Sequence, residues 1–311
     1  MPSSVVTPMK VMVCGGAGFI GSHLVERLLA DGHFVDIVDD LSTGSLSNLS
    51  VARSMNAGVK FHHLDVMSPE FVNLVGLRQS EVIYHMALLP PSATATNMAL
   101  HSAALMLAVL EAARVHTARK VIVAIPAGLL YGEVPMSSLP VKEGRASTAI
   151  GVPHVMANAI LELLGVYRES HDLEFTALAV ANVFGPRQRA EDGVVAAFAS
   201  AVVNQKRPVL FGNGKQTRDF IFIDDVIDAL ARAHNKGGGL VINIGTGIQT
   251  SILDLWNLMA VESTMQLRKE QARSGDLRRL AVSPVRARIQ LGWSSWTSLT
   301  NGIDELLNSR T

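Results

Sequence analysis

Three glycines, Gly15, Gly18 and Gly21, are the residues whose spacing most directly indicates chemistry in this chain. They lie between a short apolar stretch, Val11 to Cys14, and a stretch with helical periodicity. In such a loop the first glycine permits a tight turn, the second lets a pyrophosphate approach the backbone, and the third lets the helix pack closely on its strand. The phosphates then meet the N-terminus of the helix. The spacing therefore predicts a dinucleotide-binding loop.

A carboxylate follows this loop at the distance that a dinucleotide site requires. The sequence predicts a helix over Phe19–Ala30 and a second strand over His33–Val38, which ends at Asp39. Asp39 lies roughly twenty residues after the loop, where an acidic side chain accepts hydrogen bonds from the ribose hydroxyls. Strand, loop, helix, strand and acid together make a more specific signal than three glycines alone.

The order of the remaining strands and helices predicts the fold that holds the loop at the edge of a sheet. Apolar strands alternate with helices as far as a strand expected over Phe175–Val180. This alternation predicts an α/β fold, a Rossmann-like doubly wound parallel sheet that is complete by Val180. Shorter elements after Asn182 predict a smaller C-terminal substrate-binding lobe. We expect partly interleaved domains at 1–178 and 179–311, with the ligand cleft between them.

The composition excludes several functional classes. Of 311 residues, 48% are hydrophobic, and 27 acidic residues balance 27 basic ones. A neutral chain has no electrostatic footprint for nucleic acid or an anionic membrane. The N-terminus lacks the basic and apolar regions of a signal peptide, and the most apolar helix, expected over Ala103–Ala113, is too short to span a bilayer. We therefore expect a cytoplasmic protein in which the one cysteine, Cys14, is a buried core residue.

A series of motifs in order along the chain resembles those of the extended short-chain dehydrogenase/reductase family, in its NAD-dependent nucleotide-sugar epimerase and dehydratase branch. The motifs are Gly15–Gly21, Asp39–Gly44, Leu64–Val66, His85–Ala87, Leu129–Gly132, Asn182–Gln188, Gln216–Asp225, Asn243–Thr246 and Gly275–Arg278. The resemblance implies NAD as cofactor and a nucleoside-diphosphate sugar as ligand. It also implies further cofactor contacts beside the glycines and Asp39, namely Phe19, Ile20, Asp40, Asp65 and Val66.

The same resemblance implies which residues contact the substrate. Asn182, Arg218 and Arg278 match positions that contact the diphosphate of the sugar nucleotide, and a guanidinium group suits phosphate oxygens. We assign Arg187 and Tyr131 to the same site. Family members often form homodimers through a four-helix contact. The equivalent helices here contain the apolar stretches 103–113 and 155–166, which we interpret as core. The resemblance implies that the same helices form a homodimer contact, so we expect a homodimer.

The chain departs from the family at the positions that carry out the chemistry. Family members use a serine or threonine, a tyrosine base and a lysine four residues after the tyrosine. The matching positions here are Ala127, Ile150 and His154, and no Tyr-x-x-x-Lys pair occurs anywhere in the chain. Loss of a positioned acid or base commonly lowers the rate about a hundred- to ten-thousand-fold, so ordinary redox catalysis of the family type is not expected.

Two other side chains are candidates for the missing acid and base. Proline favours the first turn of a helix, so a helix is expected to begin near Pro153, with Ile150 in a loop and His154 in the first turn. Glu133 follows the turn at Tyr131 and is the second candidate. Each has an alternative interpretation: His154 as a pocket-lining residue without catalytic duty, and Glu133 as a solvated loop carboxylate.

These observations leave three functions open. The first, which we favour, is an isomerase that acts on a nucleotide-linked sugar without redox chemistry, for example by exchanging pyranose and furanose rings. NAD would then be structural or vestigial, and Mg²⁺ or Mn²⁺ would bridge the diphosphate. The second is a NAD-dependent epimerase or dehydratase with atypical acid and base groups, and the third is a non-catalytic nucleotide-binding subunit. We expect no metal site made by the protein alone, because adjacent His62 and His63 on a strand face opposite ways.

Overall fold

The structure is a computed structural model that describes residues 7–55, 58–87, 96–144, 150–260, 265–273 and 275–309, with the backbone alone at 96–99. Its largest feature is a parallel sheet whose described strands run in the order β11-β6-β5-β4-β1-β2-β3. These strands are β1 (Lys10–Cys14), β2 (Phe34–Asp39), β3 (Val59–His63), β4 (Val82–His85), β5 (Lys120–Pro126), β6 (Glu174–Val180) and β11 (Leu240–Ile244). Because all neighbouring pairs are parallel, their carboxyl ends meet at one edge.

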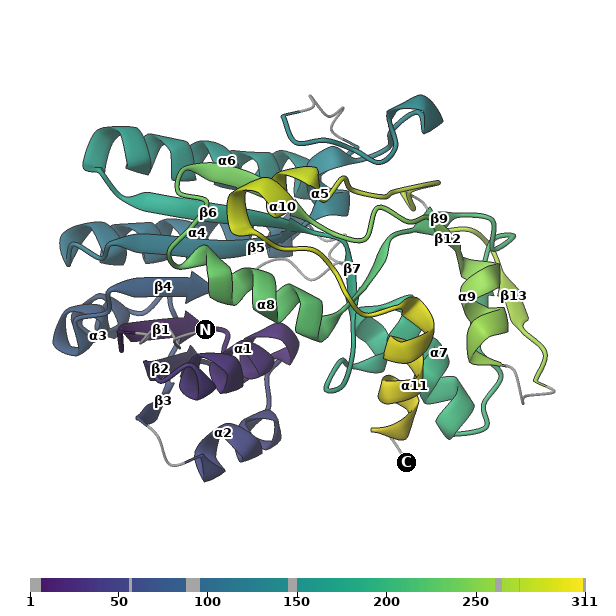
Figure 1. Ribbon diagram of the computed structural model, residues 1–311, viewed down its shortest axis with the longest axis horizontal. Coiled ribbons are helices and arrows are strands. Elements are labelled where there is room, and N and C mark those ends of the chain that lie inside the picture. Colours follow the sequence, from purple (N-terminus) through teal and green to yellow (C-terminus); the bar gives the residue numbers. More distant parts are fainter. Residues whose placement is uncertain are drawn as a thin grey trace, which may run out of the picture.

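Helices cover both faces of this sheet (Figure 1). One face carries α1 (Phe19–Ala30), α8 (Ile223–Ala233) and α10 (Val285–Leu291), and the other carries α3 (Pro69–Arg78), α4 (Thr96–Val115) and α6 (Val152–His171). The central strands are buried on both sides, as their continuous apolar sequences predict. The expected doubly wound α/β fold is confirmed, and α1 occupies the predicted range.

One expectation about the sheet is wrong, because the sheet is not complete at Val180. β11 comes from far beyond that point and pairs in parallel with β6, with Leu240 opposite Thr176 and Ile244 opposite Val180. The chain leaves the sheet after β6, forms part of the smaller lobe, and returns through α8 before it adds this strand. β11 covers an edge of β6 whose backbone groups would otherwise be unpaired. The domain limits at 1–178 and 179–311 stay a prediction.

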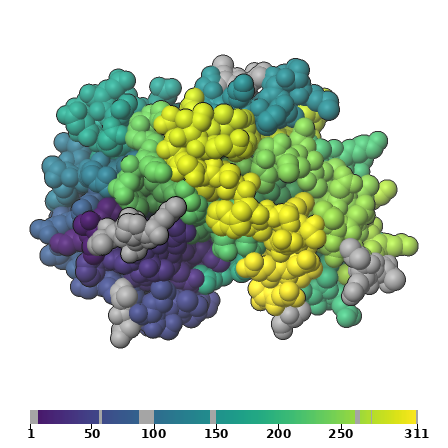
Figure 2. Space-filling view, in the orientation of Figure 1, coloured from purple at the N-terminus to yellow at the C-terminus, as the bar shows by residue number. Residues whose placement is uncertain are grey.

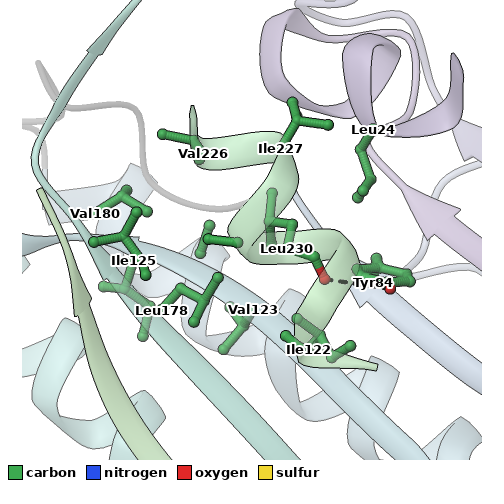
Figure 3. Close-up of a cluster of buried hydrophobic side chains, with 14 of the residues drawn as sticks. Leu24, Tyr84, Ile122, Val123, Ile125, Leu178, Val180, Val226, Ile227 and Leu230 are labelled. Carbon is green, nitrogen blue, oxygen red and sulfur yellow. Dashed lines mark hydrogen bonds between the residues drawn. The ribbon is translucent and has the colours of Figure 1, made fainter. Parts of the chain in front are cut away.

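Part of the core lies between the sheet and α8 (Figure 3). Ile122 and Leu178 of the sheet are fully buried, as is Leu230 of α8. The Tyr84 hydroxyl donates to Leu230 O at 3.4 Å. Burial of one such leucine contributes about 1.5–3 kcal/mol to stability. Because β10 (Phe220–Phe222) leads directly into α8, this packing also positions the strands of the smaller lobe.

In the described part of the chain, the smaller lobe contains α7 (Val194–Val203), α9 (Ile252–Met259), α11 (Leu299–Asn308) and short paired strands. The pairs are β7 (Asn182–Phe184) with β10, β9 (Thr217–Arg218) with β12 (Thr250–Ser251), and β8 (Val209–Phe211) with β13 (Arg268–Glu270). Phe198 of α7 and Trp256 of α9 pack edge to face. In Figure 2 the C-terminal residues, in yellow, cover the junction of lobe and sheet on the face shown.

Two further short helices complete the elements that matter for the site, α2 (Ser50–Ser54) and α5 (Ala127–Tyr131). No helix among the described residues is both long and apolar enough to cross a membrane. Residues 1–6, most of the N-terminal stretch from which we expect no signal peptide, lie outside the described residues.

Candidate active site

The glycine loop turns at the carboxyl end of β1 and leads into α1. Gly15 has a φ of +78°, and a Cβ there would lie 2.7 Å from Ala87 N, whereas a Cβ on Gly21 would overlap Gly15 O. A Cβ on Gly18 would meet Gly15 O at 3.3 Å and no other described atom within 4 Å. Phe19 and Ile20, both half-buried, begin α1. The loop therefore fits a dinucleotide, since Gly18 leaves room for a pyrophosphate at the N-terminus of α1.

Asp39 ties the end of β2 to this loop. Its Oδ2 accepts a hydrogen bond from Ala17 N at 2.8 Å, and its Oδ1 accepts one from Leu41 N at 2.9 Å. Burial raises the pKa of the Asp39 carboxyl. Because each carboxylate oxygen has two lone pairs, Asp39 can still accept a hydrogen bond from a ribose hydroxyl.

The other predicted cofactor residues follow β2 and β3 at the same edge. Leu64 N donates to Asp39 O at 3.2 Å, which keeps the two strand ends together. Asp40 and Asp65 are exposed, and each holds its own turn by accepting a backbone hydrogen bond two residues further on. Val66 is buried. The two exposed carboxylates therefore lie at this edge, each hydrogen-bonded to its own turn.

A cavity of about 670 Å³ opens at the carboxyl edge of the sheet, where the smaller lobe meets it. Its lining comes from the ends of β5 and β6, the start of α6, residues 190–198 and the segment 275–280. Four residues singled out from the sequence line it, namely Ile150, His154, Asn182 and Arg218. An open α/β sheet is expected to bind its ligand at this position.

Two arginines, Arg218 and Arg273, line the cavity together with three acidic residues, Glu191, Asp192 and Asp276. Arg218 of β9 has a side chain that is 11% exposed, forms an ion pair with Asp276 and donates from Nη1 to Thr217 O at 2.9 Å. Burial lowers the pKa of Arg218, and the charge of Asp276 acts against that shift. The Cζ of Arg273 lies 3.8 Å from the centroid of the Phe211 ring. Two guanidinium groups in one cavity suit the oxygens of a diphosphate.

The structure brings Arg273 to the cavity in place of Arg278, which the sequence analysis selected. The Arg278 side chain is 81% exposed and does not line the cavity. The backbone N–H of Arg278 donates to Glu133 Oε2 at 2.8 Å. Glu133, one of the two candidate catalytic residues, therefore fastens the loop that carries Arg278 and does not line the cavity either.

His154 is the candidate catalytic residue that does reach the cavity. α6 begins at Val152, one position before the expected Pro153, and places His154 in its first turn. His154 is 8% exposed, and its Nε2 is buried without a hydrogen-bond partner among the described residues. Burial lowers the pKa of His154, and a hydrogen bond to the backbone of Gly128 opposes that shift. The imidazole is therefore neutral at pH 7 and able to accept a proton.

The two other positions matched to the family's catalytic groups carry no ionisable side chain. Ala127 is the first residue of α5 and is fully buried. Ile150 lies in the loop before α6, as predicted, lines the cavity and is 45% exposed. Of the three matched positions, His154 is therefore the one with a titratable side chain, and it lines the cavity from the start of α6.

Tyr131 and Arg187 are not brought to the cavity. Tyr131 is buried at the end of α5, where its hydroxyl donates to Asn243 Oδ1 at 2.6 Å, and burial raises its pKa. Arg187 contacts Ser22 and Glu26 of α1. Both side chains therefore connect elements of the fold in this structure.

The adjacent histidines of β3 have separate partners. His62 Nε2 lies 2.8 Å from Asp36 Oδ1, and His63 Nε2 lies 3.1 Å from Asp40 O. Within the ranges that the structure describes, no group of three or more histidine, cysteine, aspartate or glutamate residues is placed to hold a metal ion.

Known proteins share both the sequence pattern and the fold. Residues 11–245 match the model of the NAD dependent epimerase/dehydratase family. The UDP-glucose 4-epimerase of Mycolicibacterium smegmatis is 37% identical over 310 residues, which cover 95% of this chain and 96% of that one. The UDP-glucose 4-epimerase of Thermotoga maritima, solved with UDP-glucose, has a TM-score of 0.90 at 29% identity and covers 97% of this chain and 98% of that one. The enzyme of Thermus thermophilus, solved with NAD, has a TM-score of 0.88 at 30% identity, covering 97% and 99%.

Proposed function

Because the chain belongs to the NAD-dependent epimerase/dehydratase family, we propose that it epimerises a UDP-linked hexose at C4 with NAD as cofactor. The observation that carries the proposal is the cavity at the sheet edge, which brings together two arginines and one neutral histidine. The full-length relatives named as UDP-glucose 4-epimerases support the choice of substrate and of the reacting carbon.

The favoured expectation of an isomerase without redox chemistry, such as a ring-exchanging mutase, is wrong. The three relatives described above, which match nearly the whole chain, are UDP-glucose 4-epimerases, and the family is described by its dependence on NAD. The Mg²⁺ or Mn²⁺ ion belonged to that expectation, and the comparisons name no metal for this family. The alternative, NAD-dependent epimerisation with atypical acid and base groups, is the better supported one.

The cofactor end of the site is the glycine loop with Asp39. NAD supplies the redox step when bound, because its nicotinamide takes up a hydride from the sugar and returns it. Gly18 leaves the backbone open to the pyrophosphate, and the first turn of α1 offers unpaired N–H groups to it. Asp39 accepts hydrogen bonds from the adenosine ribose while it holds Ala17 in place.

The substrate end of the site is the part of the cavity that Arg218 and Arg273 line. Arg218 and Arg273 bind the diphosphate, and the Asn182 amide, which also lines the cavity, donates to oxygens of the same ligand. Arg273 is held flat against Phe211, so its guanidinium loses less freedom when a phosphate binds. These contacts fix the nucleotide, and the sugar then extends towards His154.

We assign the proton transfer to His154. Removal of a hydride from C4 leaves a carbonyl only if the proton of the 4-hydroxyl group is removed too, so a base is required. A neutral imidazole at this position would accept this proton and later return it to the same oxygen. His154 is neutral because burial lowers its pKa, and its Nε2 has no described competing partner.

The test is turnover of UDP-glucose to UDP-galactose in the presence of NAD, followed by proton NMR. The wild-type chain should interconvert the two, and His154→Gln should lower kcat about a hundred- to ten-thousand-fold, while UDP affinity changes less than about twofold. The matched control is His171→Gln, at the exposed end of the same helix, which should keep wild-type turnover. If His154→Gln turns over like the wild type, His154 is not the base.

A second candidate is a non-catalytic nucleotide-binding subunit. It is favoured by Ala127 and Ile150, which offer no hydroxyl at the positions matched to the family's catalytic serine and tyrosine. This candidate predicts binding of NAD and UDP without turnover over a panel of neutral, acetylated and acidic UDP-sugars. Turnover of any of them by the wild-type chain would exclude it.

A further inference from the structure

The loop that follows β7 is fastened to the helix that follows the glycine loop. Arg187 Nη2 donates to Glu26 Oε1 at 2.7 Å, and Arg187 Nη1 donates to Ser22 Oγ at 3.2 Å. His23 Nε2 donates to Pro186 O at 3.2 Å, since a carbonyl can only accept. We call these contacts, made by Ser22, His23, Glu26, Pro186 and Arg187, the latch. The ion pair is about four-fifths buried on both sides, so solvent screens it less than a surface pair.

The other side of the same loop lines the substrate cavity. Asn182 precedes the latch along the chain, and Asp192 and Gly193 follow it; all three line the cavity. Gln188 joins the two parts, because its Nε2 donates to Val183 O at 3.2 Å and to Asp192 O at 3.1 Å. A displacement of Arg187 would therefore move the wall of the cavity through a short and well-bonded segment.

The backbone of the latch is held in a conformation that it would not keep by itself. Arg187 has a φ of +67°, in the left-handed region that side chains other than glycine seldom adopt. Such a conformation persists where the surrounding contacts require it. In this conformation the Arg187 side chain donates two hydrogen bonds to α1.

The latch reaches the first turn of α1, where the glycine loop meets the helix. Ser22 Oγ accepts from Arg187 and itself donates to Phe19 O at 3.1 Å, while Ser22 N donates to Gly18 O at 3.1 Å. The chain of hydrogen bonds thus runs from the cavity wall to the residues that border the open space beside Gly18. Burial, and then the charge of Arg187, lower the pKa of His23 to about 4, so His23 is neutral in the latch at pH 7.

We propose that Arg187 is a positioning residue: it couples the cavity wall 182–193 to the first turn of α1, so that the sugar nucleotide and the dinucleotide bind cooperatively. The identity of the two ligands rests on the proposed function. Arg187 does not line the cavity, so we assign it no contact with the sugar nucleotide, in contrast to the substrate-site role assigned to it from the sequence. By linkage, whatever NAD adds to the affinity for UDP, UDP adds to the affinity for NAD.

The first test needs no ligand. Amide hydrogen exchange is measured for peptides covering 186–197 in the wild type, Arg187→Ala and Glu26→Gln. Each variant should exchange at least about fivefold faster in this segment, because Arg187→Ala removes both side-chain hydrogen bonds to α1 and Glu26→Gln removes the ion pair. The matched control is Arg27→Ala, which breaks ion pairs of the same helix with Asp31 and Asp228 and should leave the segment at its wild-type rate.

The second test measures the coupling. UDP is titrated calorimetrically with and without saturating NAD. Arg187→Ala and Glu26→Gln should each weaken UDP about five- to tenfold in the presence of NAD and remove most of the gain that NAD gives, and the double variant should be no worse than either alone. A loss in Arg187→Ala that Glu26→Gln does not share would mean that Arg187 binds the ligand directly, and it would overturn the proposal.

The two proposals fail separately. Unchanged exchange and unchanged UDP affinity in both variants, in a chain that epimerises UDP-glucose, would overturn the latch alone. Faster exchange in both variants, in a chain that turns over no UDP-sugar, would support the latch and overturn the epimerase.

Discussion

The Arg218 side chain in the cavity already forms an ion pair with Asp276, and this pair affects how a ligand binds to Arg218. A diphosphate either shares the guanidinium group with Asp276 or replaces it, and it gains the charge-assisted hydrogen bonds of a buried guanidinium group. We expect Arg218→Ala to weaken UDP about 10- to 100-fold, since hydrogen bonds to charged groups contribute about 1.5–3 kcal/mol. Calorimetric titration with UDP measures the loss, and the affinity for NAD should stay within about twofold.

Arg278→Ala is the matched control, because that arginine lies in the loop beside Asp276 with its side chain in solvent. It should bind UDP like the wild type. An equal loss of UDP affinity in the two variants would show that Arg218 is not placed at the diphosphate by this cavity.

At the scale of single residues, the structure places the glycines and Asp39 together at the sheet edge, whereas of the predicted substrate contacts only Asn182 and Arg218 line the cavity. Gly15, Gly18 and Asp39 are determined by local geometry, which a short motif encodes. Arg273 could not be found in the same way, because it lies over Phe211 where the β8–β13 pair brings the two segments together. No periodicity or spacing in the sequence indicates that pairing. Glu133 was selected from the sequence as a candidate acid or base. Only the fold reveals that its carboxylate accepts a hydrogen bond from Arg278 N.

At the scale of elements, the helices α4 and α6 have exposed apolar side chains on their outer face. The two helices pack against each other, and Leu107 on α4 with Val155 and Val166 on α6 are exposed. We expect the wild type to be a homodimer through this face, with twice the chain mass of 33.3 kDa. Leu107→Glu combined with Val166→Glu should give monomers, because paired carboxylates would be buried without partners. Light scattering after size exclusion measures the mass.

Ile289→Glu provides the control for this prediction. Ile289 is more exposed than either of the others, and it lies on α10 over the opposite face of the sheet. This variant should remain a dimer. A wild-type mass of one chain, or a dimer that survives the double substitution, would contradict the assignment of the face.

The elements themselves were largely predictable, because their patterns are local. Apolar strands and helical periodicity located β1 and α1, and the proline located the start of α6, within about two residues. The sequence did not predict β11 as a strand of the sheet, because no local sequence pattern indicates which strand it pairs with. β11 pairs with β6 across more than fifty intervening residues, so its place in the sheet is a property of the folded chain.

At the scale of the whole molecule, stability in acid is tied to histidines that the fold keeps neutral. Burial lowers the pKa of His85 to about 3, and burial with the charge of Arg187 lowers that of His23 to about 4. Their unfolded pKa is about 6.5, so between that pH and the folded values the unfolded chain binds protons that the native chain does not. Stability therefore falls as the pH falls through this range.

The size of this effect can be isolated at His85, which is fully buried at the end of β4 and has no described hydrogen-bond partner. Between about pH 6.5 and pH 5 each such histidine should remove about 2 kcal/mol of the free energy of unfolding. His85→Leu should remove one of these contributions, so its stability relative to wild type should rise by about 2 kcal/mol as the pH is lowered from 8 to 5. Urea unfolding at the two pH values measures the difference, and buried carboxylates, common to both chains, cancel from it. Parallel stability curves for the two chains would mean that the pKa of His85 is the same in the native and unfolded states.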